Sequence, residues 1–339
     1  MDLILTYHVE GERDTPSAAV YAEIERQVLL ADQLGYHAAW FAEHHFHIHR
    51  GHLPNPLLFV IHLAAKTRRI RLGSAVICTA LHHPLRLAED LATADVLTGG
   101  RLSIGLGSGS TPPEFAAFGV PPEAQMASAR HARFAEHLDV LEQVWRGGPI
   151  AVCGRSVQIE APPVLPRPAS ALQDVLWIAA NSLAQAEVAG ERGYGVMLSR
   201  ERTPEEMLDL VEHYRAGRRR AGLAGPGRVA ASRAVFVGPS AAAAQAAAAK
   251  AVYALVERQR ATRPQFAALP PPVSFAEACE RVQFVAGGPE VVARAIGDLR
   301  RRVPFSAFHL QPRWQGLAPS DVETSIACFL REVAPQLGG

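Results

Sequence analysis

A carboxylate, two imidazoles and an aromatic ring stand together at Glu43, His44, His45 and Phe46. Residues 37–42, which precede them, are few and mostly apolar, and this predicts a buried strand. In a barrel of parallel strands, the carboxyl ends of the strands carry the catalytic groups. A carboxylate that orients one imidazole leaves the other ring nitrogen available for proton transfer near neutral pH. The structural alternative is that Glu43 and His44 form a hydrogen-bonded pair that satisfies a half-buried turn.

The same stretch raises the question of a metal site. His45, His47 and His49 alternate along the chain and His52 follows, which makes this the densest group of potential metal ligands in the sequence. Barrel hydrolases with such a pair draw further ligands from later strands, whereas the later histidines here fall mostly on predicted helices. We therefore expect no bound metal and keep a metal-dependent barrel hydrolase as an alternative.

The composition is typical of a globular chain with a large core and no strong overall charge. Of the 339 residues, 48% are hydrophobic and 20% are charged, and the formal net charge is +1. No global field therefore favours nucleic acid or an anionic membrane as a partner. The four cysteines form no C-x-x-C pair, which fits reduced thiols. Because no basic segment precedes the first predicted strand and no apolar run could span a bilayer, we expect a cytoplasmic protein.

Strand and helix patterns alternate along the whole chain. Eight predicted strands cover residues 3–7, 37–42, 70–78, 102–106, 175–179, 195–198, 231–237 and 305–310. Helical patterns separate most of them, and no G-x-G-x-x-G turn follows the first strand, which argues against a doubly wound sheet. We therefore predict an α/β fold, a (β/α)8 TIM barrel in a single domain over residues 1–339.

Three stretches exceed the minimal repeating unit and are expected as insertions on the C-terminal face of the barrel. Residues 108–124 are rich in Gly, Ser and Pro, and residues 147–173 form a long segment with several prolines. Long loops on this face commonly shape a substrate pocket. The third insertion, residues 241–286, begins with an alanine-rich helical stretch and contains a Leu-Pro-Pro-Pro segment. We interpret it as a lid or an interface element.

Short motifs follow one another along the chain in a definite order. They occupy residues 5–7 (LTY), 40–46 (WFAEHHF), 73–76 (GSAV), 83–90 (HPLRLAED), 99–105 (GGRLSIG), 180–182 (ANS), 287–290 (GGPE) and 329–335 (FLREVAP). With these motifs at this spacing, the chain resembles the bacterial luciferase-like flavin-dependent monooxygenases.

The resemblance implies a (β/α)8 barrel that binds FMN at the C-terminal face. His44 looks like the family's active-site histidine, placed near the flavin C4a position, and Glu43 looks like its partner in shaping the flavin pocket. Ala75 and Val76 occupy the position where family members often have a non-proline cis peptide bond beneath the isoalloxazine ring. From the residues alone, the alternative for this pair is an ordinary buried strand.

The cofactor phosphate needs hydrogen-bond donors. Family members often place an arginine after the fourth strand, where this chain has Gly107, Ser108, Gly109 and Ser110. A Gly/Ser loop can supply backbone N–H groups and hydroxyls instead. Asn181 and Ser182 open the next helix, whose dipole favours an anion, although Ser182 also fits a simple N-cap. We expect Gly107, Ser108, Asn181 and Ser182 to bind the phosphate, and the missing arginine keeps F420 as an alternative cofactor.

The resemblance further implies a two-component monooxygenase. A separate flavin reductase would supply reduced FMN (FMNH2), and O2 would oxidise a small organic substrate through a flavin C4a-peroxide. F420-dependent hydride transfer and a non-catalytic flavin-binding protein are the alternatives. A homodimer that pairs through the helices predicted at residues 56–67 and 84–97 is expected by resemblance. The candidate substrate-facing groups at the barrel mouth are Tyr7, His8, His45, Phe46, His309 and Trp314.

Overall fold

Eight parallel strands close into a barrel in the computed structural model, which describes residues 1–11, 14–46 and 51–338. The strands, in their order around the barrel, are β1 (Asp2–Tyr7), β2 (Ala38–Phe41), β3 (Arg71–Ser74), β5 (Leu102–Gly107), β8 (Leu176–Ala179), β9 (Gly195–Met197), β10 (Val229–Val237) and β12 (Ala307–Gln311). The pairing of β12 with β1 closes the ring, with Asp2 opposite Ala307. The predicted (β/α)8 barrel is therefore confirmed, and each of its eight predicted strands overlaps an observed one.

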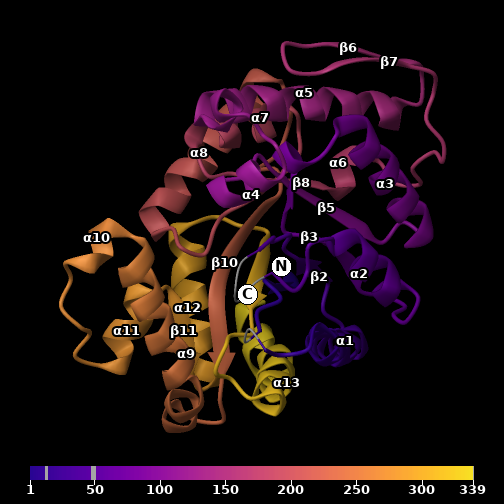
Figure 1. Cartoon of the computed structure of the whole chain (residues 1–339). Coiled ribbons are helices and arrows are strands. Elements are labelled where there is room, and N and C mark those ends of the chain that lie inside the picture. Colours follow the sequence, from indigo (N-terminus) through magenta and orange to yellow (C-terminus); the bar gives the residue numbers. More distant parts are fainter. Residues whose placement is uncertain (12–13, 47–50, 339) are drawn as a thin grey trace.

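Helices surround the barrel (Figure 1). The helices of this outer layer are α1 (Ser17–Leu34), α2 (Pro56–Ala64), α3 (Pro84–Leu97), α5 (Ala127–Arg146), α7 (Leu183–Glu191), α8 (Pro204–Arg220), α12 (Pro289–Arg302) and α13 (Pro319–Cys328). Five of them carry a proline at the first turn, where its missing N–H is not needed. Among the described residues, none of the helices is both long enough and apolar enough to cross a membrane.

The core lies in two layers. The larger one fills the space between the outward side chains of the strands and the inner faces of the helices. The smaller one fills the start of the barrel, where the rings of Trp40 and Trp177 lie 5.4 Å apart beside Ile4 and Met197. Large apolar side chains thus occupy the N-terminal half of the barrel interior. The interior is left open at the carboxyl ends of the strands, where a site can form.

The segment 108–124 lies on the C-terminal face, as predicted, because it follows the end of β5. It contains α4 (Pro112–Ala117) and the 3-10 turn η2 (Pro122–Gln125). The predicted place of residues 147–173 is wrong. They connect the end of α5 to the start of β8, so they lie at the N-terminal ends of the strands. They form a hairpin of β6 (Ile150–Cys153) and β7 (Gln158–Ala161), followed by α6 (Leu172–Val175).

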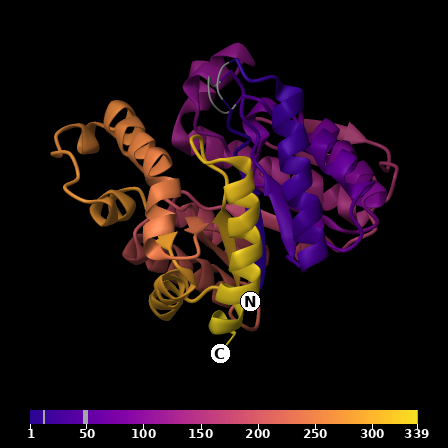
Figure 2. The same cartoon turned by 90° about the horizontal axis from the view of Figure 1, so that it is seen from below.

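The segment 241–286 is a helical extension with an apolar core of its own. It consists of α9 (Ala241–Thr262), α10 (Pro264–Ala267) and α11 (Phe275–Arg281), and it leads into β11 (Phe284–Gly287). Strand β11 pairs in parallel with the upper half of β10, outside the closed ring. Figure 2 shows the extension projecting to one side of the barrel, while the two chain termini lie close together. We refer to residues 241–283 as the helical extension.

Helices α7 and α8 approach closely because glycines lie at their contact. A Cβ atom on Gly190 would lie 2.0 Å from the carbonyl oxygen of Tyr214, and one on Gly217 would lie 2.3 Å from the carbonyl oxygen of Glu187. Real structures do not tolerate such distances, so a side chain at either position would push the helices apart. This contact holds α7, whose first turn borders the cavity described below.

Gly190→Ala is expected to destabilise the fold by about 2–3 kcal/mol, since the new methyl group meets backbone that cannot move aside. The matched control is Gly297→Ala in α12, where the nearest atom to a new Cβ would be 3.6 Å away. This control should stabilise the fold by about 0.5–1 kcal/mol, because alanine is the better helix former. Urea unfolding of both variants provides the measurement. Equal and small effects at the two positions would contradict the close packing of α7 on α8.

Candidate active site

A cavity of about 270 Å³ opens at the carboxyl ends of the strands. Each of the eight barrel strands, or the loop that directly follows it, contributes side chains to the cavity wall. This is the position where (β/α)8 barrels carry their sites.

 Fifteen of the side chains that line the cavity carry a polar, thiol or charged group. These are Thr6, His8, Glu43, His44, Cys78, Ser110, Thr111, Glu114, Asn181, Ser199, Arg200, Glu201, Ser232, His309 and Gln311.

The carboxylate of Glu43 is the centre of the first cluster. It is only 6% exposed and accepts hydrogen bonds from His45 Nε2 at 2.8 Å, His82 Nε2 at 2.9 Å and the backbone N–H of Cys78 at 2.8 Å. Burial alone would raise the pKa of Glu43, but the hydrogen bonds from both imidazoles and from the backbone outweigh it and lower the pKa. The predicted pairing of Glu43 with His44 is therefore wrong, since the carboxylate binds His45 and His82.

His45 and Phe46 lie at the rim of the cavity. The backbone N–H of His45 donates to the buried Glu114 of α4 at 3.0 Å, and its ring packs edge-on against Phe118 at 4.7 Å. Phe46 is 69% exposed and adopts a positive φ of 55°, which is rare for a residue with a side chain. Neither side chain belongs to the cavity wall, and their contact with substrate stays a prediction.

His44 belongs to a second cluster, with His8 from the loop after β1. His8 Nδ1 and His44 Nε2 are 3.0 Å apart, and the two rings are stacked with centroids 5.3 Å apart. A hydrogen bond between two imidazoles requires one nitrogen to donate and the other to accept. Both rings line the cavity, as predicted for each of them. The partner of the predicted catalytic histidine is thus an imidazole that lies 36 residues away in sequence.

Ala75 and Val76 interrupt the predicted strand 70–78 and divide it into β3 and β4 (Ile77–Cys78). The peptide bond between them is cis, as the resemblance implied. It is tied to β2 on both sides, because Ala75 N–H donates to Phe41 at 2.8 Å and Val76 accepts from the N–H of Glu43 at 3.2 Å. Both side chains line the cavity. A Cβ on Gly107 would lie 2.8 Å from Val76 Cγ2, so glycine is needed beside this bend.

Of the residues predicted to bind the phosphate, Ser108 and Ser182 form hydrogen bonds with Gln185, whereas Asn181 lines the cavity. The hydroxyl of Ser108 is buried and accepts from Gln185 Nε2 at 3.1 Å, while Ser182 caps α7 by accepting from the backbone N–H of Gln185 at 3.3 Å. Asn181 lines the cavity. Ser110, from the Gly/Ser loop expected to supply hydroxyls, also lines it, as does Thr111, which was not predicted. Their signal in the sequence was the same Gly/Ser-rich run that drew attention to Ser108.

Tyr7 and Trp314 were predicted to face substrate, and the structure places both elsewhere. Tyr7 points out of the barrel and stacks on Phe41 at 5.6 Å, and burial raises its pKa far above the usual range. Trp314 packs in the core of the helical extension against Phe284, with the guanidinium of Arg200 over its ring at 4.7 Å. His309 does line the cavity, and burial lowers its pKa to about 4. It is therefore neutral near pH 7.

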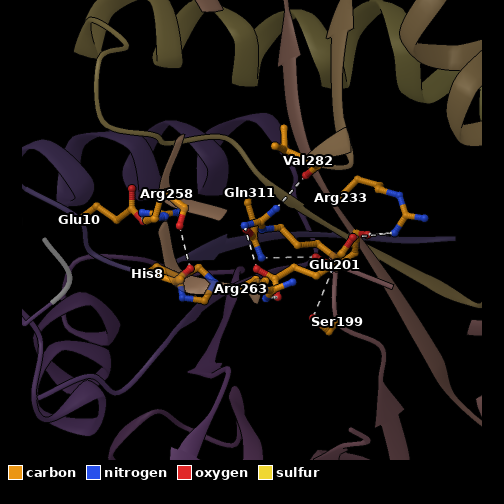
Figure 3. Close-up of polar contacts among 12 residues, drawn as sticks. His8, Glu10, Ser199, Glu201, Arg233, Arg258, Arg263, Val282 and Gln311 are labelled. Carbon is orange, nitrogen blue, oxygen red and sulfur yellow. Dashed lines mark hydrogen bonds and ion pairs between the residues drawn. The ribbon is translucent and has the colours of Figure 1, made fainter. Parts of the chain in front are cut away.

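The helical extension is fastened to the cavity rim by charged groups (Figure 3). Arg258 forms an ion pair with Glu10 at 3.2 Å, and Arg263 pairs with Glu201. Arg200, which lines the cavity, donates to the carbonyl oxygen of Val282 at 2.9 Å. Glu10 and Arg200 are both buried, so the contacts that they form are shielded from solvent more than ordinary surface pairs are. The extension therefore forms part of the cavity surroundings.

The histidine-rich stretch that was considered as an alternative metal site lies only partly within the described residues. His47 and His49 lie outside the described residues. His45 binds Glu43, and His52 Nδ1 lies 3.0 Å from Ser17 Oγ. Among the described residues, no group of three or more His, Cys, Asp or Glu side chains is arranged to hold a metal ion.

These features together define a (β/α)8 barrel with a polar cavity at the carboxyl ends of its strands. The family model for luciferase-like monooxygenases matches residues 1–303, and the chain therefore belongs to this family. The oxygenase component of a flavin-dependent trigonelline monooxygenase from Acinetobacter baylyi is 29% identical over 223 residues, which cover 63% of this chain and 59% of that protein. An F420-dependent glucose-6-phosphate dehydrogenase from Beutenbergia cavernae is 28% identical over 197 residues, or 57% of this chain and 55% of that one. The chain thus spans little more than half the length of these curated relatives.

Solved structures agree with the fold over almost the whole chain. The monooxygenase RslO1 from Streptomyces bottropensis superposes with a TM-score of 0.86 at 25% identity and covers 99% of both chains. The oxygenating constituent of 3,6-diketocamphane monooxygenase from Pseudomonas putida, solved with FMN, gives a TM-score of 0.84 at 18% identity over 99% of this chain and 98% of that one. The second comparison supports the fold alone.

Glu43→Gln is expected to lower the free energy of unfolding by about 2–3 kcal/mol at pH 7, because an amide cannot accept all three hydrogen bonds of the carboxylate. The lowered pKa of Glu43 means that this stabilisation is present above the ordinary carboxyl pKa and is lost as pH falls through the folded-state value. The difference from wild type should therefore shrink below about pH 4.5.

Urea unfolding between pH 3.5 and 7.5 measures this difference. The matched control is Glu257→Gln, which alters an exposed glutamate of α9 and should change stability by less than about 0.5 kcal/mol at every pH. A difference for Glu43→Gln that stays constant over the whole range would show that the ionised carboxylate does not hold the cluster together.

Proposed function

We propose that this protein is the oxygenase of a two-component flavin-dependent monooxygenase, which uses reduced FMN and O2 to oxidise a small organic substrate. The observation that carries the proposal is the arrangement of three features around one cavity. These are the cis peptide bond at Ala75–Val76, the hydroxyl and amide groups of Ser110, Thr111 and Asn181, and the imidazole of His44. Family membership supports an oxidoreductase, and the named monooxygenase relatives favour oxygen chemistry.

The residues that line the cavity support a flavin as the bound cofactor. Ala75, Val76 and Ala179 offer a small apolar surface on which a planar ring could rest. Next to it, Ser110, Thr111 and Asn181 present uncharged donors suited to a phosphate, and α7 begins directly after Asn181. Reduced flavin, when bound, supplies the electrons for the activation of O2. The residues of the chain would position that ring and exclude water from it.

In this proposal, His44 holds or moves a proton at the cavity wall. Its Nε2 is engaged with His8 Nδ1, so the tautomer of each ring constrains the other. Glu43 acts as a positioning residue. It lies beside His44 in sequence, but its hydrogen bonds go to His45, His82 and the backbone of Cys78, which fixes the backbone on either side of the cis peptide bond.

An F420-dependent oxidoreductase that transfers hydride is the second candidate. Ser108 stands where family members often have an arginine, and its hydroxyl is already bonded to Gln185. A weaker phosphate site would disfavour FMN. Relatives named as F420-dependent dehydrogenases match more than half of the chain. A non-catalytic flavin-binding protein would need neither cofactor in reduced form.

The proposed partners are a separate flavin reductase and a second copy of this chain. For the homodimer, apolar side chains on α2 and α3 are exposed: Leu58 is 69% exposed, Leu97 is 59% exposed and Val96 is 43% exposed. Burying them against a second copy would remove apolar surface from water. The relative described as an oxygenase component supports the reductase.

Anaerobic titration with reduced FMN and with reduced F420 separates the two candidates. We expect reduced FMN to bind at micromolar concentration and the complex to consume O2 when aerobic buffer is added. Tight binding of reduced F420, together with no reaction with O2, would instead establish hydride transfer. Binding of oxidised FMN with no O2 consumption after reduction would favour the non-catalytic alternative.

His44→Ala is expected to reduce substrate oxidation by about 100-fold or more, as removal of a proton-transfer group usually does. The affinity for FMN should change little, because the imidazole is not among the groups proposed to hold the flavin. The control is His62→Ala, which removes a half-exposed histidine of α2 that pairs with Glu25. Steady-state turnover and flavin titration of both variants give the measurement. Unchanged turnover in His44→Ala would remove His44 from the mechanism.

A further inference from the structure

The cavity has a polar floor formed by three neighbouring strands. His309 and Gln311 point inward from β12, Ser232 points inward from β10 and Thr6 points inward from β1. All four are at most 5% exposed. His309 Nδ1 lies 3.2 Å from Thr6 Oγ1, and Gln311 Nε2 lies 3.5 Å from Ser232 Oγ. We call these four residues the polar floor.

Two polar atoms of this floor are buried without a partner. Within the described part of the chain, His309 Nε2 and Gln311 Oε1 make no hydrogen bond. An unsatisfied buried polar atom costs about 1–3 kcal/mol, and native proteins leave few of them. The two side chains are two residues apart on one strand and therefore on the same face. Two such atoms on one cavity wall indicate a ligand that completes their hydrogen bonds.

The chemistry of the floor restricts that ligand. Gln311 Oε1 can only accept a hydrogen bond, so the ligand must offer an O–H or N–H group. Because burial keeps His309 neutral near pH 7, its Nε2 offers no positive charge to an anion. Ser232 and Thr6 are uncharged as well. The floor is therefore suited to an uncharged group with a hydrogen to donate, such as a phenol, an enol or an amide.

The position of the polar floor in the barrel assigns this hydrogen-bond donor to the substrate. Strands β12, β1 and β10 are neighbours in the closed barrel, and they lie across it from β3, β5 and β8. The proposed flavin seat and its phosphate donors belong to β3 and to the loops after β5 and β8. We propose that His309 and Gln311 form the subsite that anchors an uncharged O–H or N–H donor of the substrate. This assignment to the substrate rests on the proposed function.

Phenol and anisole test the subsite, since they have nearly the same shape and only phenol donates a hydrogen bond. Their dissociation constants are measured by NMR titration of the full-length protein, with and without oxidised FMN. Wild type should prefer phenol, and Gln311→Met should reduce the ratio of the two affinities about fivefold to tenfold, with anisole binding unchanged. His309→Leu, as a second variant, should reduce the ratio in the same direction. Gln336→Met, an exposed glutamine near the C-terminus, is the control and should leave it unchanged.

If the ratio of the phenol affinity to the anisole affinity is the same in wild type and in both floor variants, the proposed subsite is wrong. If Gln311→Met loses as much affinity for FMN as for phenol, the assignment to the substrate is wrong. The polar floor would then bind the cofactor. If FMN does not bind to wild type at all, the proposed function fails. A phenol preference that persists in the protein without FMN and disappears in Gln311→Met would still establish the subsite.

Discussion

The structure of the site depends on one buried carboxylate. Glu43 divides its two oxygens among His45, His82 and the backbone of Cys78, which come from the loop after β2, the segment after the 3-10 turn η1 (Thr79–Leu81) and the end of β4. A buried charge is tolerated only when its hydrogen bonds are satisfied. These three contacts therefore hold the ends of two neighbouring strands in one arrangement, and the cis peptide bond at Ala75–Val76 lies between them.

The same contacts explain the direction of His44. Since the carboxylate is occupied by His45 and His82, the His44 ring turns toward His8 on the neighbouring strand end. Adjacent residues of an extended chain point to opposite sides, so one of two successive histidines can bind Glu43 while the other faces the cavity. The structural and the functional interpretations of this stretch thus apply to different residues. His45 holds Glu43 in place, and the ring of His44 lines the cavity.

The sequence was sufficient to predict the barrel, because its strands are short apolar runs between clear turn signals. No residue range was predicted for helix α5, although Phe134, Leu138, Leu141 and Val144 follow a helical period and are buried. That omission also explains the misplaced insertion. Without a helix between β5 and residues 147–173, the segment appeared to follow a strand and was assigned to the C-terminal face. The helix carries the chain back to the opposite face.

For the site, residues adjacent in sequence were predictable and long-range partners were not. Glu43, His44, Ala75 and Val76 stand in local motifs, whereas the pairing of His8 with His44 arises only when β1 and β2 lie side by side. The alternation of side chains along a β-strand would have excluded Tyr7 from the cavity. Thr6 and His8 line the cavity, so the residue between them must point outward, into the core against α1 and Phe41.

The same alternation of side chains places His309 and Gln311 on the inner face of β12, with the buried Leu310 between them on the outer face. An inward position at the carboxyl end of a barrel strand can be filled by an apolar residue, as Ile4, Trp40 and Met197 fill positions lower in the barrel. The polar residues at the upper level leave hydrogen-bonding capacity that the protein itself does not use. An apolar floor would be more stable without a ligand, so the polar floor is best explained by what binds above it.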